Sequence, residues 1–313
     1  MPVLTLLRKR GIIVEVNVWC ADCFGDKIQA SNGLSEPGNV KERFFVNSTI
    51  ETTVLAGLRV HHVIPAKKRF SILLLFIHGM WSTGKMFIPL MRILGDLGFE
   101  CYAVDQSGHG DSFSGNGTGK ISLDEHIGKI KQVISELGRP VIVIGHSMGA
   151  TAASNACVGE PLVKGFVVMT GVHESAMTML TRVIGCIWRY ALDLRDGGRI
   201  NLRRKDAATM LFNTMCGHRL EVCLDKLEPE SGLVASELLT GKYQIERLNC
   251  PMLVIGGKRD RMTSNQVGLA EKFSADYREV DACHMAMLDP NRIQAAYAII
   301  GWLKEEFGGE FVR

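Results

Sequence analysis

Residues 141–150 read VIVIGHSMGA, and this stretch decides the fold. The apolar run Val141–Ile144 predicts a buried strand, and the residues from Met148 onward predict a helix. Between them lies the motif G-x-S-x-G, centred on Ser147. A serine on so tight a strand-to-helix turn takes a strained backbone that presents its hydroxyl, and flanking glycines let other chain segments pack past it. We therefore predict that Ser147 is a catalytic nucleophile.

Apolar strands and helically spaced segments alternate on both sides of this stretch. Strands without polar alternation, each followed by a helix, are typical of a parallel sheet covered on both faces, so the order predicts an α/β class. The alternation lapses between residues 172 and 245, where helical segments follow one another with no strand between them. The predicted strands are Arg43–Ser48, Thr52–Leu55, Leu58–Ile64, Ser71–Ile77, Glu100–Val104, Val141–Ile144, Lys164–Thr170, Met252–Ile255 and Tyr277–Val280. The predicted helices are Met86–Leu97, Ile121–Leu137, Met148–Val158, Ser175–Leu194, Lys205–Cys216, His218–Leu227, Leu233–Leu239, Ser264–Phe273 and Arg292–Phe307.

This pattern divides the chain into three parts. Residues 1–42 form an N-terminal extension without an assigned role, and residues 43–171 and 246–313 form the α/β core. Residues 172–245 form a helical insertion rich in methionine. Methionine-rich helices are most often core, but the position of this insertion inside an α/β chain favours a cap or lid over one end of the sheet.

The composition excludes several classes of partner. The net charge is +3, and Lys and Arg are scattered among acidic residues, unlike the basic face of a nucleic-acid binder. The longest purely apolar run, Ile72–Ile77, is too short to cross a bilayer. Near the N-terminus the basic cluster Arg8–Arg10 follows the apolar stretch, whereas a secretory signal has the opposite order. We predict a cytoplasmic protein without an integral membrane segment.

The nine cysteines are spread over the chain without the spacing of a disulfide framework. Their odd number suggests reduced, mostly buried thiols. The C-x-x-C pair Cys20–Cys23 lacks the second pair that a zinc site needs and the βαβ context of a redox site. We therefore predict neither a metal nor a cofactor.

A second turn follows an earlier predicted strand and reads His78-Gly79-Met80-Trp81. Acyl transfer needs preorganised N–H donors for the oxyanion that forms during the reaction. We assign this oxyanion hole to the backbone N–H groups of Met148, directly after the nucleophile, and of Met80, with Trp81 as the alternative to Met80. We expect the ring of His78 to hold the turn together through hydrogen bonds.

A third turn, Asp105–Ser112, carries a histidine and two aspartates that could be taken for catalytic groups. It is rich in glycine and follows a predicted strand. We interpret it as a structural turn at the carboxyl ends of the strands, in which Asp105 bonds to the backbone.

A serine hydroxyl needs a base, and the base needs a carboxylate to fix its tautomer. His284 is the candidate base because it follows a predicted strand and precedes the last helix. Asp260 is the candidate acid because it lies just past another strand end, which gives the chain order Ser, Asp, His. Glu174 and Asp281 remain alternatives for the acid, since Glu174 also follows a strand and Asp281 is close to His284 in the sequence.

Four elements together resemble the α/β-hydrolase superfamily, over about residues 43–307: His78-Gly79, the motif around Ser147, Asp260 with the glycines before it, and His284 before the final helix. The resemblance implies an α/β-hydrolase fold with a mostly parallel eight-stranded sheet flanked by helices. It also implies that the helical cap is inserted after the sixth strand.

The resemblance to individual branches of this superfamily is mixed. His284–Leu288 is similar to the histidine region of plant methylesterases and hydroxynitrile lyases. The His78-Gly79 turn and the Asp105–Ser112 segment look more like esterase, peroxidase-like and lysophospholipase-like branches. Ser147 stands where epoxide hydrolases and haloalkane dehalogenases of this fold carry an aspartate.

The predicted chemistry is hydrolysis of a small-molecule ester, thioester or lactone through an acyl-enzyme. Candidates for an apolar substrate pocket are Trp81, Met177, Trp188 and Met210. Alternatives stay open, because the same triad serves acyl-transferring cyclases and the fold also hosts lyases, cofactor-free oxygenases and non-catalytic small-molecule receptors. The presence of all the expected catalytic groups favours catalysis over binding alone. A homodimer is one option for the oligomeric state.

Overall fold

The structure is a computed structural model that describes residues 8–9, 12–13, 48–112, 118–172 and 198–309. The chain forms two compact units, residues 1–43 and residues 44–313. In the first unit the short strands β1 (Arg8–Lys9) and β2 (Ile12–Ile13) pair antiparallel. Several sequence predictions fall outside the described residues, among them the Cys20–Cys23 pair, all but the last residue of the strand Arg43–Ser48, and the helix Ser175–Leu194.

The second unit is built on an eight-stranded sheet in the order β12-β11-β8-β7-β5-β6-β4-β3. The pairs β3–β4 and β4–β6 are antiparallel, and all other neighbours run parallel. The predicted α/β-hydrolase sheet is confirmed. Its strands are β3 (Thr49–Leu55), β4 (Leu58–Ile64), β5 (Leu73–Ile77), β6 (Glu100–Val104), β7 (Val141–His146), β8 (Val163–Met169), β11 (Met252–Gly257) and β12 (Asp276–Val280).

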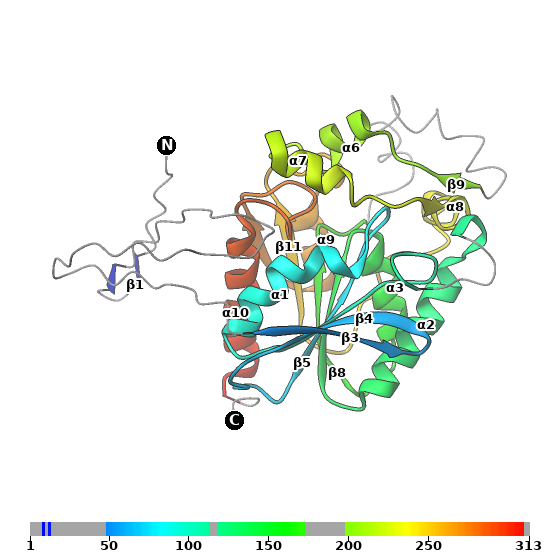
Figure 1. Ribbon diagram of the computed structural model, residues 1–313. Helices are drawn as coiled ribbons and strands as arrows, with labels where there is room; N and C mark the ends of the chain where they lie inside the picture. Colours follow the sequence, from blue (N-terminus) through cyan, green and yellow to red (C-terminus); the bar gives the residue numbers. More distant parts are fainter. Residues whose placement is uncertain (1–7, 10–11, 14–47, 113–117, 173–197, 310–313) are drawn as a thin grey trace. The chain divides into compact units, whose positions relative to one another are not determined.

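Two hydrophobic cores lie on opposite faces of this sheet. In β5, Leu74 and Phe76 face one core and Leu73 and Leu75 face the other, because successive side chains of a strand point to opposite faces. Helices α1 and α10 cover the first core, and α2, α3 and α9 cover the second (Figure 1). Burial on both faces explains why these strands lack polar alternation. The bounds are η1 (Gly84–Phe87), α1 (Ile88–Asp96), η2 (Thr118–Lys120), α2 (Leu123–Leu137), α3 (Met148–Cys157), α9 (Gln266–Phe273) and α10 (Arg292–Phe307).

The described residues between β8 and β11, 198–245, are called the cap segment below. Its helices α6, α7 and α8 lie at one end of the sheet (Figure 1). The expectation of helices without any strand is wrong here, because β9 and β10 pair as a short antiparallel ribbon. Two-residue strands are too short to leave a periodic pattern, so this pairing has no signal in the local sequence. The bounds are β9 (Arg199–Ile200), α6 (Arg204–Met210), α7 (Gly217–Leu224), β10 (Glu230–Ser231) and α8 (Gly232–Leu239).

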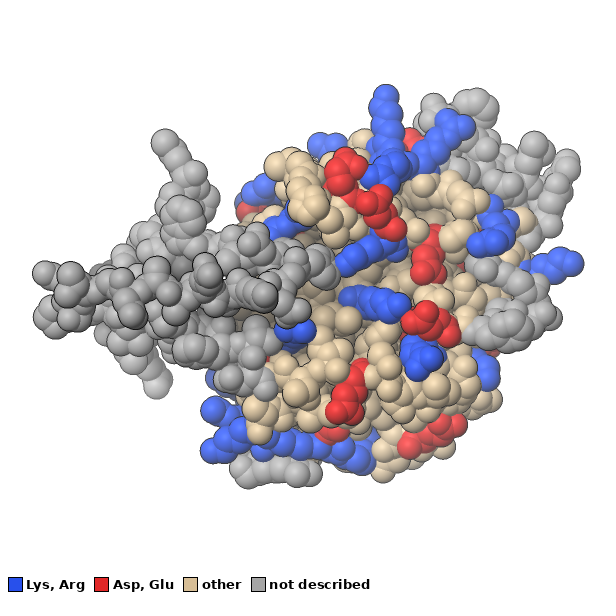
Figure 2. All heavy atoms as spheres, viewed as in Figure 1, with Lys and Arg blue, Asp and Glu red and all other residues tan. Residues whose placement is uncertain are grey.

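Charges of both signs are mixed over the face drawn in Figure 2, where Lys and Arg lie among Asp and Glu. In the described ranges, no helix is long and apolar enough to span a bilayer. The cysteines of these ranges carry free thiols, and most of them are buried: Cys101, Cys157, Cys216, Cys223, Cys250 and Cys283.

Candidate active site

Ser147 lies on a strained turn between β7 and α3. Its φ is 52° and its ψ is −125°. The glycine two residues before Ser147 makes room for the turn, since a Cβ on Gly145 would lie 2.4 Å from the Cα atom of Ala150. A positive φ at a non-glycine residue costs on the order of 1–3 kcal/mol and persists only where the surroundings enforce it. The backbone of Ser147 is therefore held in the form that the G-x-S-x-G motif predicts.

The turn after β5 packs directly against this serine. A Cβ on Gly79 would lie 2.7 Å from the Cβ atom of Ser147, and a Cβ on Gly149 would lie 2.2 Å from the carbonyl oxygen of His78. Only glycine permits these two close approaches. They bring the turn that carries Met80 against the start of α3, whose first residue is Met148. The two candidate oxyanion donors thus belong to backbone segments in contact.

His284 and Asp260 meet above the ends of two neighbouring strands. His284 lies in the loop between β12 and α10, and Asp260 lies in the loop after β11. Nδ1 of His284 is 3.0 Å from Oδ2 and 3.2 Å from Oδ1 of Asp260. Their side chains are 2% and 1% exposed. In this geometry the Nδ1–H group donates to the carboxylate, and the lone pair on Nε2 can accept a proton.

Three further donors hold the carboxylate of Asp260. The N–H groups of Met262 and Thr263 donate to Oδ1 at 2.7 and 3.2 Å, and the hydroxyl of Thr263 donates to Oδ2 at 2.6 Å. Burial acts to raise the pKa of Asp260, but the electrostatic interaction with His284 and the hydrogen bonds to the carboxylate outweigh burial and keep the pKa below its ordinary value. The group is therefore ionised at neutral pH and can stabilise an imidazolium.

Of the two alternatives for the acid, Asp281 is among the described residues, and its carboxylate is paired with an arginine. Asp281 pairs on the surface with Arg259, whose Nε and Nη2 atoms lie 2.6 Å from Oδ1 and 2.6 Å from Oδ2. Its carboxylate is therefore engaged elsewhere. Glu174 lies outside the described residues.

The other polar turn residues hold the loops together. The backbone N–H of Gln106 donates to Nε2 of His78 at 3.0 Å, and burial lowers the pKa of His78 to about 4, so its ring is neutral. Asp105 accepts a hydrogen bond from the backbone N–H of Gly84 at 2.8 Å, which confirms its interpretation as a structural residue. Asp105 also contacts Nε2 of His61 at 3.1 Å, a partner that the sequence analysis did not find.

Comparison with known proteins gives the family. The chain matches the alpha/beta hydrolase family over residues 74–296, a range that includes Ser147, Asp260 and His284. It belongs to the alpha/beta hydrolase family.

Relatives of this alpha/beta hydrolase share a part of its sequence and most of its fold. A stretch of 90 residues is 39% identical to 2-(acetamidomethylene)succinate hydrolase of Mesorhizobium japonicum (strain LMG 29417 / CECT 9101 / MAFF 303099). That match covers 28% of this chain and 31% of the relative, so it spans about a third of the relative's length.

Two solved structures illustrate the likeness of the fold. The thermophilic esterase from Thermogutta terrifontis superposes with a TM-score of 0.61 at 18% identity, covering 82% of this chain and 98% of that one. E-2-(acetamidomethylene)succinate hydrolase superposes with a TM-score of 0.60 at 19% identity, covering 82% and 99% of the two chains.

The cap segment of this alpha/beta hydrolase touches the turn after β5, the loop that carries Asp260 and the loop that carries His284. These contacts join residues far apart in the chain and most of them involve backbone carbonyls, so the sequence alone does not indicate them. The contacts are Trp81 Nε1 to the carbonyl of Ile200 (3.1 Å), Glu228 N to the carbonyl of Trp81 (3.2 Å), Asn213 Nδ2 to the carbonyl of Arg259 (3.0 Å) and the Thr214 hydroxyl to Oδ2 of Asp289 (2.5 Å).

Asp289 is a buried carboxylate in the loop that carries His284, and it was not singled out from the sequence. It is 1% exposed. Besides Thr214 it accepts the backbone N–H groups of Cys283 at 2.9 Å and Asn291 at 2.8 Å. The Asp289-Pro290 pair is a turn signal that could have drawn attention to it.

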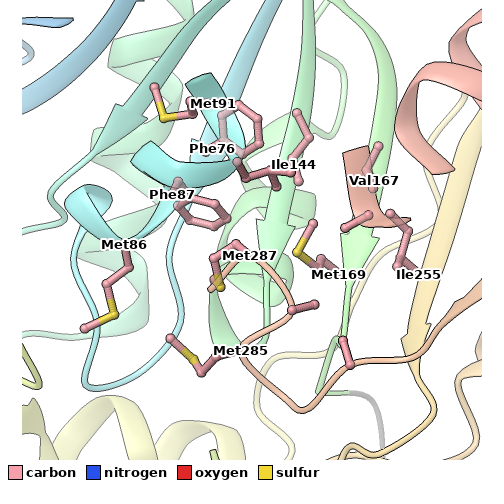
Figure 3. Packing of buried hydrophobic residues seen from close by; sticks show 14 of the residues in the cluster. Phe76, Met86, Phe87, Met91, Ile144, Val167, Met169, Ile255, Met285 and Met287 are labelled. Atoms are coloured by element: carbon pink, nitrogen blue, oxygen red, sulfur yellow. The ribbon is translucent and has the colours of Figure 1, made fainter. Parts of the chain in front are cut away.

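Methionines are concentrated in the first core (Figure 3). Met285, which follows the candidate base, belongs to the same cluster as Met86 of η1 and Met210 of α6. Trp81 and Met210 are 7% and 8% exposed. In the part of the chain that the structure describes, no group of three or more His, Cys, Asp or Glu residues is placed to hold a metal ion. The other two predicted pocket residues, Met177 and Trp188, lie outside the described residues.

Proposed function

We propose that this member of the alpha/beta hydrolase family is a serine hydrolase that cleaves a carboxylic ester, thioester or lactone of a small, largely apolar molecule. Ser147 acts as the nucleophile, His284 as the base and Asp260 as the acid that orients the base. The observation that carries the proposal is the buried contact of 3.0 Å between His284 Nδ1 and Asp260. It fixes the tautomer in which Nε2 can take the proton of a serine.

The reaction proceeds in two halves. His284 Nε2 takes the hydroxyl proton of Ser147 while the serine oxygen bonds to the substrate carbonyl carbon. The tetrahedral intermediate collapses, His284 gives its proton to the leaving alcohol or thiol, and the acyl group stays on Ser147. A water molecule then attacks this acyl-enzyme with His284 again as the base, which releases the acid and restores the serine.

The oxyanion of each half is stabilised by backbone donors. We assign this role to the N–H groups of Met148 and Met80. The N–H of Met148 is the first of α3, so the positive end of the helix dipole lies at the developing charge. The close approach of Gly79 to Ser147 supports the contribution of Met80. Each such donor contributes about 3–4 kcal/mol to transition-state stabilisation.

The apolar, methionine-rich surroundings favour an apolar acyl or alcohol group. We assign Trp81 and Met210 to this apolar pocket. Trp81 follows Met80 in the turn after β5 and contacts the cap segment through the carbonyl of Ile200, and both residues belong to the first core. Methionine side chains adapt to irregular ligands because they are unbranched and flexible.

A second candidate substrate comes from the sequence match to 2-(acetamidomethylene)succinate hydrolase. This match reaches 39% identity over 90 residues. Cleavage of 2-(acetamidomethylene)succinate is therefore tested beside cleavage of the esters. If the protein cleaves this compound and not the esters, the proposed substrate class changes, but the proposed triad does not.

Labelling with a fluorophosphonate probe tests the nucleophile. The wild type should be labelled, and Ser147→Ala and His284→Ala should not. Ser154→Ala is a matched control, because Ser154 is a buried serine of α3, the helix that follows Ser147, and its hydroxyl bonds to the Thr151 carbonyl at 3.1 Å. Equal labelling of wild type and Ser147→Ala, or no labelling of the wild type, would refute the assignment.

A series of p-nitrophenyl esters with increasing acyl length tests the apolar pocket. We expect kcat/KM to rise with chain length, by about 0.8 kcal/mol or roughly fourfold for each buried methylene. A flat or falling series would count against an apolar acyl site.

A further inference from the structure

Thr170, directly after β8, has a backbone conformation that is rare for its residue type. Its φ is 46°. Among the described non-glycine residues with positive φ, Thr170 is the β-branched one; the others are Ala56, Trp81, Ser147, Asn265 and Ser274. A β-branched residue at positive φ is a genuine outlier, with a cost on the order of 1–3 kcal/mol. Thr170 is also completely buried.

The strained residue lies where the three loops of the candidate triad meet. Its backbone N–H donates to the carbonyl of Ile255 in β11, the strand that leads to the acid, at 2.9 Å. Its hydroxyl donates to the carbonyl of His284 at 3.0 Å. The preceding carbonyl, of Met169, accepts the backbone N–H of Ser147 at 3.1 Å. Two consecutive residues therefore bond to the nucleophile, to the base and to the strand before the acid.

The carbonyl of His284 has a second donor, which leaves its peptide little freedom to rotate. Nε2 of His146 lies 3.0 Å from this oxygen. Burial lowers the pKa of His146 to about 3, so its ring is neutral and donates through Nε2–H. A carbonyl oxygen has two lone pairs, and both are used here.

Gln266 of α9 holds the turn at Thr170 through hydrogen bonds to the next residue, Gly171. The amide of Gln266 accepts the N–H of Gly171 at 3.1 Å and donates to the carbonyl of Gly171 at 2.9 Å. This paired contact holds the peptide after Thr170, so the strained conformation does not relax. A residue kept strained in this way is characteristic of a site that requires the geometry.

We propose that Thr170 is a positioning residue for the base: its hydroxyl and strained backbone fix the peptide of His284 relative to Ser147. The inference rests on the proposed function, in which His284 takes the proton of Ser147. Thr170 touches no reacting atom. It acts through the backbone from which the imidazole extends, and a displacement of the ring by about 1 Å can reduce the rate about a hundredfold.

Removal of the hydroxyl at constant shape tests this proposal. Thr170→Val should lower kcat by roughly 10- to 100-fold with KM within about twofold, because substrate binding does not involve Thr170. Thr170→Ser keeps the hydroxyl and should restore kcat to within about threefold of the wild type. Thr151→Val is the matched control: Thr151 is a buried threonine of α3 whose hydroxyl bonds to the carbonyl of Val172 at 3.4 Å, outside the triad loops.

A second readout does not depend on turnover. The proton between His284 Nδ1 and Asp260 should give a downfield NMR signal that Thr170→Val shifts or broadens and that Thr170→Ser and Thr151→Val leave in place. If Thr170→Val does not fold, Thr170→Ala replaces it, since alanine also lacks the hydroxyl and carries no β-branch. An unchanged signal and unchanged kcat in the variant without the hydroxyl would overturn the proposal. A shifted signal in a protein that the fluorophosphonate probe does not label would uphold the positioning role and refute the proposed function instead.

Discussion

At the scale of single residues, the tautomer of one histidine decides what the site can do. A neutral imidazole with its proton on Nδ1 presents a basic Nε2, and the opposite tautomer presents none to a serine. Asp260 selects the first form through its contact with Nδ1 at 3.0 Å. Thr263 in turn holds the carboxylate with its hydroxyl at 2.6 Å. The reactivity proposed for Ser147 thus depends on a chain of buried contacts that runs from Thr263 through Asp260 to His284.

Asp260→Asn tests this chain. The amide can donate to Nδ1 and so stabilise the wrong tautomer, and it carries no charge to balance an imidazolium, so kcat should fall about 10⁴-fold. Steady-state kinetics give kcat, and circular dichroism checks that the fold persists. Asp281→Asn is the matched control, because Asp281 pairs with Arg259 on the surface. A larger loss at Asp281 than at Asp260 would contradict the assignment of the acid.

At the scale of elements, the proposed oxyanion hole depends on how closely a turn can approach a helix. The turn after β5 and the start of α3 are in contact because both Gly79 and Gly149 lack a Cβ. Any side chain at either position would push the two segments apart. The donors of Met80 and Met148 would then no longer converge on one oxygen, although each segment would keep its own secondary structure.

Gly79→Ala is therefore expected to damage catalysis more than stability. The new Cβ would lie 2.7 Å from the Cβ of Ser147, so the turn must move away from the serine. We expect kcat to fall roughly 10²- to 10³-fold, the effect of losing one oxyanion donor. Gly301→Ala in α10 is the control, because its Cβ would meet no atom within 4 Å. Comparable kcat values in the two variants would show that the turn does not take part.

The elements differ in how far the sequence alone could predict them. The buried strands of the core were predictable because burial on both faces gives short continuous apolar runs, and the helices because burial of one face gives a period of 3.6 residues. Helix α10 was predicted at its observed bounds, Arg292–Phe307. The ribbon of β9 and β10 was not, because two-residue strands leave no period. Ser147, Asp260 and His284 could be singled out by motif and strand end, whereas Thr170 was missed because a backbone dihedral leaves no mark on composition.

At the scale of the whole second unit, buried polar groups of the cap segment form ion-pair and hydrogen-bond contacts with the core. The distance between Oε2 of Glu230, in β10, and Nε2 of His109, in the loop after β6, is 3.3 Å. Neither side chain is exposed. The hydroxyl of Ser231 donates to the carbonyl of Ile121 at 2.6 Å. Breaking a buried ion pair by removal of one partner costs about 3–5 kcal/mol. Separation of the cap segment from the core therefore carries an electrostatic cost as well as a hydrophobic one.

The charges around this pair determine its pH dependence. Burial acts to lower the pKa of His109, but the charge of Glu230 outweighs it and raises the pKa above the ordinary value. Burial acts to raise the pKa of Glu230, but the charge of His109 outweighs it and keeps the pKa below the ordinary value. The neighbouring rings of His78 and His126 are neutral, because burial lowers their pKa values to about 4 and about 3.

The sign of the effect follows from these directions. A raised histidine pKa contributes stability that is complete below the unfolded value of 6.5 and is lost as the pH rises through the folded value. A lowered glutamate pKa contributes stability that is complete above 4.5 and is lost as the pH falls through the folded value. The coupling between His109 and Glu230 should therefore be greatest between these two unfolded values and should decline at alkaline pH.

A double-mutant cycle with His109→Gln, Glu230→Gln and the double variant measures this coupling. Urea unfolding of the four proteins at several values between about pH 5 and about pH 9 gives the interaction free energy, which should be largest at the acid end. Each single variant should lose about 3–5 kcal/mol there, because it leaves one buried charge without its partner. The double variant should be more stable than either single variant, since it buries no unpaired charge. A coupling that stays constant over this pH range would mean that the pair is not ionised in the folded protein.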